Sequence, residues 1–281
     1  MQCYNRIFQI LGLFGFVLLY AQPYKNDSLR AEFIYKLSAK LDTRSTSQYV
    51  ELFTLKVGEE RAFFASNESL KKDSVMNVSL RVIARENGTT LSYKGVSMPE
   101  TYFHYTIIQT SANVQYFESA GMALLTYKEP ILNNWVLLDE SKVINTFSCR
   151  KATVVYKGRR WVAWYTTDLP FQFGPYKFAG LPGLIVKITD DKGDYDFELV
   201  QSTSSFNLKG RNVDIKKSRY YGAVETSQKK LEKALIDSES NASAILGSYN
   251  TVIVSGKEML RQREKILEEN RKYGNPIELL E

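Results

Sequence analysis

Histidine and cysteine are almost absent from this chain of 281 residues. It contains one histidine, His104, and two cysteines, Cys3 and Cys149. A single histidine excludes the usual multi-histidine catalytic zinc sites. Since Cys3 lies within the N-terminal leader described below, Cys149 has no partner for an intramolecular disulfide. An exported form of the protein must therefore depend on its hydrophobic core, which 44% hydrophobic residues can supply.

Long hydrophobic runs are also missing, apart from one at the N-terminus. After Arg6 an apolar run covers residues 10–20 and ends before Ala21. This run is far shorter than the roughly 20 residues of a spanning helix, and its pattern is typical of a secretory signal peptide. We expect residues 1–21 to be removed, which leaves residues 22–281 as one soluble β-rich domain without a transmembrane segment, periplasmic or secreted. The alternative is an uncleaved anchor, because the residue two before Ala21 is large.

Charge of one sign is not concentrated anywhere in the chain. Lys and Arg number 37 against 31 Asp and Glu, a formal net charge of +6. Nucleic-acid-binding proteins gather basic residues on one face, whereas here they are interspersed with acidic ones. We therefore expect no nucleic-acid partner and attribute the charge to solubility.

Alternation of apolar and polar residues predicts strands over most of the chain. The predicted strands are 31–42, 48–57, 61–66, 101–111, 114–120, 123–128, 135–138, 148–156, 160–167, 184–189 and 194–201. Helical spacing and capping residues predict helices over 67–85, 226–237 and 255–273. These elements predict an α+β domain, a large curved antiparallel sheet resembling an open half-barrel. It would carry one internal helix and a C-terminal helix, within a helical region over 217–281.

Two of the predicted strands are joined by a loop rich in proline, glycine and aromatic residues, within the stretch 161–189. Its Leu-Pro-Gly-Leu segment fits a type II turn in which Gly183 takes a positive φ. Loops of this length without secondary structure are often functional. The predicted ligand- or partner-binding residues are Trp161, Trp164, Phe171, Phe173, Tyr176 and Phe178. The alternative is that this loop plugs the end of its own sheet, because aromatic side chains are primarily core residues.

The run from Gly174 to Ile185, GPYKFAGLPGLI, resembles the signature of the GLPGLI family, exported proteins of the Gram-negative envelope that are named after this motif. The motif residues are Gly174, Pro175, Gly180, Leu181, Pro182, Gly183, Leu184 and Ile185. The similarity extends to Trp135, to residues 149–152 and to the terminal residues 275–279. The resemblance implies an envelope location. It implies no catalytic residue, because the family has no established activity.

Cys149 and His104 are the candidates for nucleophilic chemistry. Arg150 and Lys151 would lower the pKa of the Cys149 thiol, but a cysteine nucleophile also needs a base. On strand alternation Cys149 shares a face with Thr153, which suits a core thiol. His104 lies among aromatic residues, so we expect it to be a core or edge residue.

Four aspartates crowd the turn between the last two predicted strands. They are Asp190, Asp191, Asp194 and Asp196. Their spacing does not match the calcium loop of an EF-hand, and Asp-Lys-Gly is ordinary turn chemistry. We therefore expect no metal site and no cofactor.

Three functions remain open. The first is a non-catalytic envelope protein that binds an apolar small molecule, a lipid or lipidated cargo in the concavity of the sheet. The second is an interaction module for an outer-membrane protein or assembly, with the aromatic loop as docking surface. The third is a hydrolase that uses Cys149 or the acidic turn. The absence of a recognisable catalytic set favours the first function, so the protein is expected not to be an enzyme.

Overall fold

The computed structural model describes residues 27–85, 97–203, 205–240, 265–266, 268–270 and 272–279. The predicted signal peptide lies outside the described residues, as does most of the helix predicted over 255–273. In the described part of the chain, no helix is long and apolar enough to cross a membrane.

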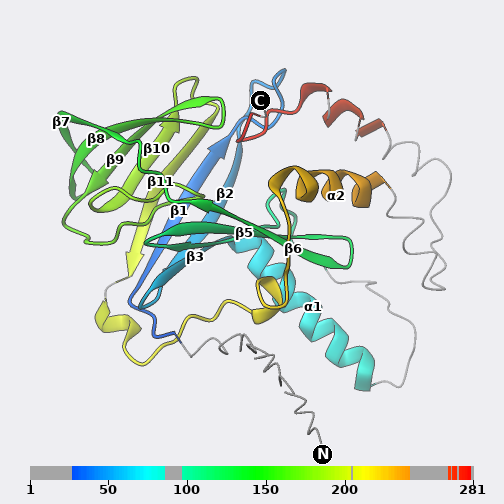
Figure 1. The fold of residues 1–281 in the computed structure, drawn as a ribbon. Helices are drawn as coiled ribbons and strands as arrows, with labels where there is room; N and C mark the ends of the chain where they lie inside the picture. Colours follow the sequence, from blue (N-terminus) through cyan, green and yellow to red (C-terminus); the bar gives the residue numbers. More distant parts are fainter. Residues whose placement is uncertain are drawn as a thin grey trace, which may run out of the picture.

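One twelve-stranded sheet dominates the fold (Figure 1). Its strands are β1 (Ala31–Ala39), β2 (Tyr49–Val57), β3 (Arg61–Ser66), β4 (Thr106–Thr110), β5 (Asn113–Ala120), β6 (Ala123–Pro130), β7 (Val136–Ile144), β8 (Phe147–Tyr156), β9 (Arg159–Thr166), β10 (Leu184–Asp190), β11 (Tyr195–Thr203) and β12 (Val224–Glu225). Their order across the sheet is β12-β6-β5-β4-β3-β2-β1-β11-β10-β9-β8-β7. Strand β1 is therefore central, between a first arm that runs out to β12 and a second arm that runs out to β7.

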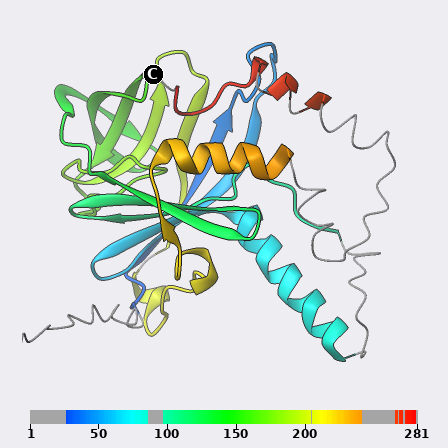
Figure 2. The same cartoon turned by 45° about the vertical axis from the view of Figure 1, so that its right-hand side comes forward.

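The helices occupy a much smaller part of the molecule. They are α1 (Asn67–Arg85), α2 (Gln228–Ser240) and the short 3₁₀ turns η1 (Ser205–Leu208) and η2 (Lys217–Arg219). Helix α1 begins directly after β3, where the Ser66 hydroxyl accepts a hydrogen bond from the Ser69 amide at 3.0 Å. Figures 1 and 2 show α1 leading away from the sheet, while α2 lies beside β5 and β6.

The predicted α+β half-barrel is therefore wrong. The sheet is mixed, because β12 adds to β6 in parallel while every other neighbouring pair is antiparallel. It is one open sheet, with α1 in contact with β2 and β3 and α2 in contact with β5 and β6. The sequence could not predict β12, because a strand of two residues has no alternation to detect.

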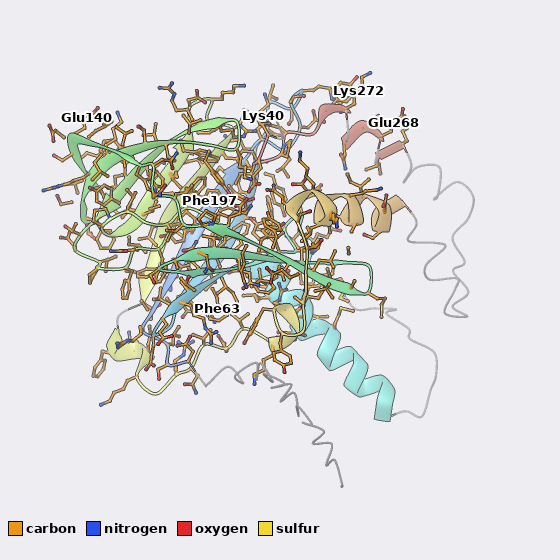
Figure 3. All side chains as sticks on the ribbon, in the orientation of Figure 1. Lys40, Phe63, Glu140, Phe197, Glu268 and Lys272 are labelled. Atoms are coloured by element: carbon orange, nitrogen blue, oxygen red, sulfur yellow. The ribbon has the colours of Figure 1, made fainter. Side chains whose placement is uncertain are left out.

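Strand alternation explains how the core forms. Along β1 the burial alternates without exception, and Phe33, Tyr35 and Leu37 all point to the buried face. The main core extends from this face over both arms. A second, smaller core around Phe63 lies on the opposite face of the first arm, where Ile215 and Tyr220 cover it. Figure 3 shows the side chains packed between the strands, with Phe197 and Phe63 marking the two cores.

The predicted hairpin between β8 and β9 is confirmed. Lys157 and Gly158 connect the strands with φ of 47° and 74°. Two successive residues with positive φ are typical of a type I′ turn, whose twist matches that of the flanking strands.

Candidate functional site

The connection from β9 to β10, residues 167–183, contains the aromatic loop predicted from the sequence and folds into the space between the two arms. The side chain of Gln109, which is fully buried on β4, holds it there. Its amide nitrogen donates to the carbonyls of Gly174 at 2.8 Å and Tyr176 at 2.6 Å, and its oxygen accepts from the Gly174 amide at 3.3 Å. The first arm thus fixes a loop that belongs to the second.

Two glycines of the motif are required for different reasons. A Cβ on Gly183 would lie 2.0 Å from the Thr166 carbonyl oxygen, so only glycine allows the backbones to approach this closely. The prediction that Gly183 takes a positive φ is wrong. The positive φ belongs to Gly180, at 93°, where a Cβ would also lie 2.5 Å from the Leu132 carbonyl oxygen.

The structure separates the six predicted binding residues into three groups. Trp161, Tyr176 and Phe178 are buried in the main core, and the rings of Trp161 and Phe178 lie 4.5 Å apart. Trp164 is half-buried, with the Lys142 ammonium 3.9 Å from the centre of its ring. Phe171 and Phe173 are half-buried and line an open groove.

Lys177 is a charged residue of the motif that lies almost fully buried, with 2% of its surface exposed. Its ammonium donates to the Tyr127 hydroxyl at 2.6 Å and pairs with Glu129 at 3.3 Å and with Glu278. The rings of Tyr116, Tyr127 and Tyr176 lie 5.2, 4.8 and 5.4 Å from it, within the range of cation–π attraction. Two carboxylates and three rings thus compensate the buried charge.

Glu278 reaches this cluster from the tail of the chain, residues 274–279. Its Oε1 accepts a hydrogen bond from the Tyr176 hydroxyl at 2.6 Å, and its Oε2 accepts one from the Gln228 amide of α2 at 2.7 Å. We call Lys177, Glu129, Glu278, Tyr127 and Tyr176 the tail cluster. It joins two sequence features that resemble the same family, the loop motif and the terminal residues 275–279.

Glu129 is a carboxylate of the tail cluster whose pKa is shifted from its usual value. Burial opposes its ionisation, but Lys177, together with hydrogen bonds from Lys157 and Tyr156, outweighs the burial and lowers the pKa of Glu129. Glu129 and Lys157 form an ion pair at 2.8 Å. The carboxylate is therefore kept ionised as part of the packing.

Arg159 anchors the tail at a second point. Its guanidinium pairs with Asp190 at 2.6 Å, and it donates to the Pro276 carbonyl at 2.8 Å and to the Asn275 side chain. The acidic turn is thus occupied by ion pairs, because Asp194 also lies 3.4 Å from Arg159. No group of three or more His, Cys, Asp or Glu residues in the described ranges is arranged to hold a metal ion.

Cys149 and His104 lie in different surroundings. Cys149 is fully buried in the main core, and burial raises the pKa of its thiol. His104 is exposed just before β4. The thiolate that nucleophilic chemistry requires is therefore disfavoured at Cys149.

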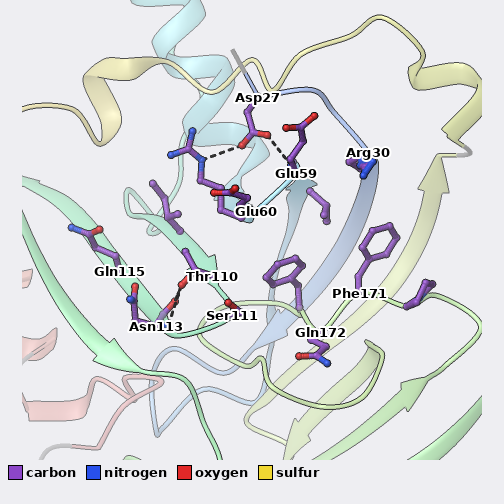
Figure 4. Close-up of a pocket in the computed structure, with 16 residues that line it drawn as sticks. Asp27, Arg30, Glu59, Glu60, Thr110, Ser111, Asn113, Gln115, Phe171 and Gln172 are labelled. Atoms are coloured by element: carbon purple, nitrogen blue, oxygen red, sulfur yellow. Dashed lines mark hydrogen bonds and ion pairs between the residues drawn. The ribbon is translucent and has the colours of Figure 1, made fainter. Parts of the chain in front are cut away.

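The groove that Phe171 and Phe173 line has a volume of about 1280 Å³ (Figure 4). One wall is formed by the start of β1 and the β2–β3 turn, with Asp27, Arg30, Glu59, Glu60 and Arg61. The other is formed by the β4–β5 turn, with Thr110, Ser111, Asn113 and Gln115, and by the aromatic loop, with Pro170, Phe171, Gln172 and Phe173. Both arms thus contribute to one site.

One pair of charges in the groove is already matched. Asp27 pairs with Arg61 at 3.1 Å and accepts a hydrogen bond from the Glu59 amide at 2.8 Å. Arg30, Glu59 and Glu60 are exposed. Within the part of the chain that the structure describes, none of these three forms an ion pair through its side chain. The groove can therefore offer two carboxylates and one guanidinium to a ligand.

Five residues of the site were not predicted from the sequence: Gln109, Glu129, Arg159, Lys177 and Glu278. Two of these residues carried a signal, because Lys177 interrupts an aromatic motif and Glu278 lies in the terminal residues that resemble the same family. Gln109 and Glu129 carried none, since polar residues are common on strands.

Comparisons with known proteins find a similar fold and a family without a known function. The model of a family described as "Protein of unknown function (Porph_ging)" matches residues 154–187, which run from the end of β8 through the aromatic loop into β10. No curated protein matches the sequence.

Two solved structures of PNGF-II, in space groups P21 and C2, are similar in fold, each with a TM-score of 0.50 and with 11% and 12% identity. Each comparison covers 74% of this chain but 33% of the PNGF-II chain, so the protein spans about a third of its solved structural neighbour. Residues 154–187 thus resemble a family of unknown function, and the fold is similar to part of a larger protein.

Proposed function

We propose that this protein is a non-catalytic binding protein whose ligand lies in the groove. The observation that carries this proposal is an open space of about 1280 Å³ with two half-buried phenylalanines on its wall. Small-molecule pockets usually measure roughly 300 to 1,000 Å³. The groove therefore suits an extended ligand better than a compact one.

The aromatic wall of the groove is held in place before any ligand arrives. The ring of Phe171 packs edge-on against Phe33 of the buried face, with ring centres 5.8 Å apart. The Phe173 carbonyl accepts a hydrogen bond from the Ile185 amide at 3.2 Å. A preformed wall lowers the entropy lost on binding, which favours a binding role.

The proposal includes no catalytic step. The described lining of the groove contains neither histidine nor cysteine, and Arg61 already pairs with Asp27. Three of the aromatic residues named from the sequence, Trp161, Tyr176 and Phe178, are buried in the main core. Phe171 and Phe173 are thus left to contact the apolar part of an amphipathic ligand, whether a lipid, lipidated cargo or a protein segment.

The groove is tested by changing Phe171 and Phe173 to Ala together. Native mass spectrometry of the protein purified from its own cells, and fluorescence of an added apolar probe, measure what is bound. We expect wild type to retain a ligand and enhance the probe's fluorescence, and the double variant to do neither. A Trp164→Ala variant is the control, because Trp164 does not line the groove. Equal binding by all three proteins would contradict the proposal.

We further propose that the protein acts in the cell envelope as a member of the GLPGLI family, after removal of residues 1–21. The supporting observations are the leader pattern and the motif resemblance described above. Cell fractionation followed by N-terminal sequencing tests this. Full-length protein in the cytoplasm would contradict it.

A second candidate function is an interaction module, favoured by strand β7. This strand is an edge of the sheet, and its Val136, Leu137 and Val143 side chains are 57%, 54% and 72% exposed. An exposed apolar edge can pair with a strand of a partner. In-cell crosslinking from position 143 tests this, with a photoreactive residue at exposed position 192 as control. Recovery of the same proteins from both positions would count against it.

A further inference from the structure

The charges available in the groove are opposite in sign to the charge of the whole protein. The chain carries a formal net charge of +6. In the groove Asp27 and Arg61 neutralise each other, and the exposed Glu59 and Glu60 face a single exposed Arg30. The open part of the site is therefore acidic on a basic molecule, and it favours a cationic ligand over an anionic one.

The aromatic side of the groove also favours a cation. Figure 4 shows Glu59 and Phe171 bordering the same open space from different elements. A ligand that spans the groove can therefore place a cationic group near the carboxylate and another group on the face of the ring.

Neutral polar groups lie on the wall opposite the carboxylates. The Asn113 and Gln172 amides and the Ser111 hydroxyl line this wall. Amide side chains both donate and accept hydrogen bonds, so they match the alternating N–H and C=O groups of an extended backbone.

We propose that the groove binds an extended polypeptide segment in which basic side chains alternate with apolar ones. This inference rests on the proposed function and names its ligand. Glu59 and Glu60 bind the basic side chains, Phe171 and Phe173 contact the apolar ones, and the amides bind the backbone. An anionic membrane surface does not fit, because the two glutamates repel its headgroups.

The probes are labelled peptides of equal length, titrated against the full chain by fluorescence anisotropy. The first alternates Lys with Phe, the second replaces Lys by Glu, and the third replaces Phe by Ser. We expect the first to bind at least tenfold more tightly than either other peptide and to weaken as salt is added, because exposed charges are screened. Vesicles with anionic lipids, tested beside the peptides, should not bind.

The variant that tests the charge carries Glu59→Gln and Glu60→Gln, which keep side-chain size. We expect it to bind the Lys–Phe peptide about tenfold more weakly, a loss of about 1.4 kcal/mol. Asp139→Asn, an exposed carboxylate on β7 outside the groove, is the matched control and should bind like wild type.

The outcomes separate this inference from the proposed function. If the Phe171 and Phe173 double variant loses a ligand while the glutamine variant binds like wild type, the groove is a binding site but its ligand is not basic, and the inference is overturned. Preferential binding of the Glu–Phe peptide or of anionic vesicles also overturns it. If neither variant changes any binding, the inference and the proposed function both fail.

Discussion

The two sides of the aromatic loop differ in how their charges are matched. On the inner side Lys177 is buried among two carboxylates and three tyrosine rings. On the outer side Phe171 and Phe173 line a groove in which Glu59 and Glu60 are exposed. A buried charge must be paired within the fold, whereas an exposed charge is solvated by water and is free to bind a ligand. The inner side therefore stabilises the fold, and the outer side is the one available to a ligand.

This difference also explains what the sequence motif means. Its glycines Gly180 and Gly183 permit a close approach of two backbone segments, and its lysine, Lys177, forms an ion pair with Glu278 of the tail. These are structural requirements. The residues proposed to bind a ligand lie on the loop just before the motif and on two turns that share no motif with it.

The largest expected effect comes from Lys177→Ala, which leaves the buried Glu278 without its ammonium partner and Glu129 with Lys157 alone. Removing one partner of a buried ion pair costs about 3–5 kcal/mol, so the free energy of unfolding should fall by that amount in urea titrations. Lys192→Ala, in an exposed turn, is the control and should change it by less than about 0.5 kcal/mol. A similar small change for both variants would show that the tail cluster does not stabilise the fold.

A smaller loss is expected from Gly183→Ala. The new Cβ would lie 2.0 Å from a backbone oxygen of Thr166, and the backbones must shift, which costs roughly 1–3 kcal/mol. Gly193→Ala is the comparison, because nothing lies within 4 Å of a Cβ added there. Only the φ of 67° is unfavourable for alanine, and we expect it to lower the free energy of unfolding by about 1 kcal/mol. Thermal unfolding measures both. A more damaging change at Gly193 would contradict the close-approach argument.

The pH dependence of stability tests Glu129. Its pKa in the folded protein is lowered from 4.5, so its contribution is present above about pH 4.5 and is lost as the pH falls through the folded value. As the pH falls below about 4.5, wild type should therefore lose stability more steeply than Glu129→Gln, which has no carboxylate there. Glu140→Gln, an exposed change, should leave the slope of wild type. Parallel curves for wild type and Glu129→Gln would refute the prediction.

The smallest effect on stability is expected from Phe171→Ala on the outer side. The side chain is only half-buried, so we expect a loss of about 1 kcal/mol, since full burial of a phenylalanine is worth roughly 1.5–3 kcal/mol. Phe178→Ala on the inner side is the matched change and should cost about 3–5 kcal/mol, because that ring is fully buried. Urea unfolding of both variants measures the two losses. Equal losses would place the two rings in the same core.

Much of the local structure was predictable because its causes are local. The alternation of β1, the helix over 67–85 and the turn at Lys157 and Gly158 each depend on residues close together in the chain. The strand preceding the motif and the strand following it were also predicted near their observed positions. The assignment of Gly183 to a positive φ was wrong, because its constraint is a contact with Thr166 across the loop and not its own turn.

The candidate site was predicted only in part. Phe171 and Phe173 were named from the sequence, and both line the groove. Trp161, Tyr176 and Phe178 were named by the same reasoning, but they lie in the core, because aromatic composition does not tell which side of a loop is covered. The groove's other wall comes from β1 and two turns, which no spacing in the sequence connects to the loop.

The order of residues was enough to predict that the chain forms many short strands, that one stiff loop carries aromatic residues, and that one histidine cannot form a multi-histidine zinc site. The three-dimensional arrangement was needed to show that the two arms bury the inner side of this loop and leave the outer side open. It also shows that Lys177 contacts Glu278, which lies 101 residues further along the chain. Periodicity reports the geometry of neighbouring residues, whereas these contacts depend on how twelve strands are ordered across the sheet.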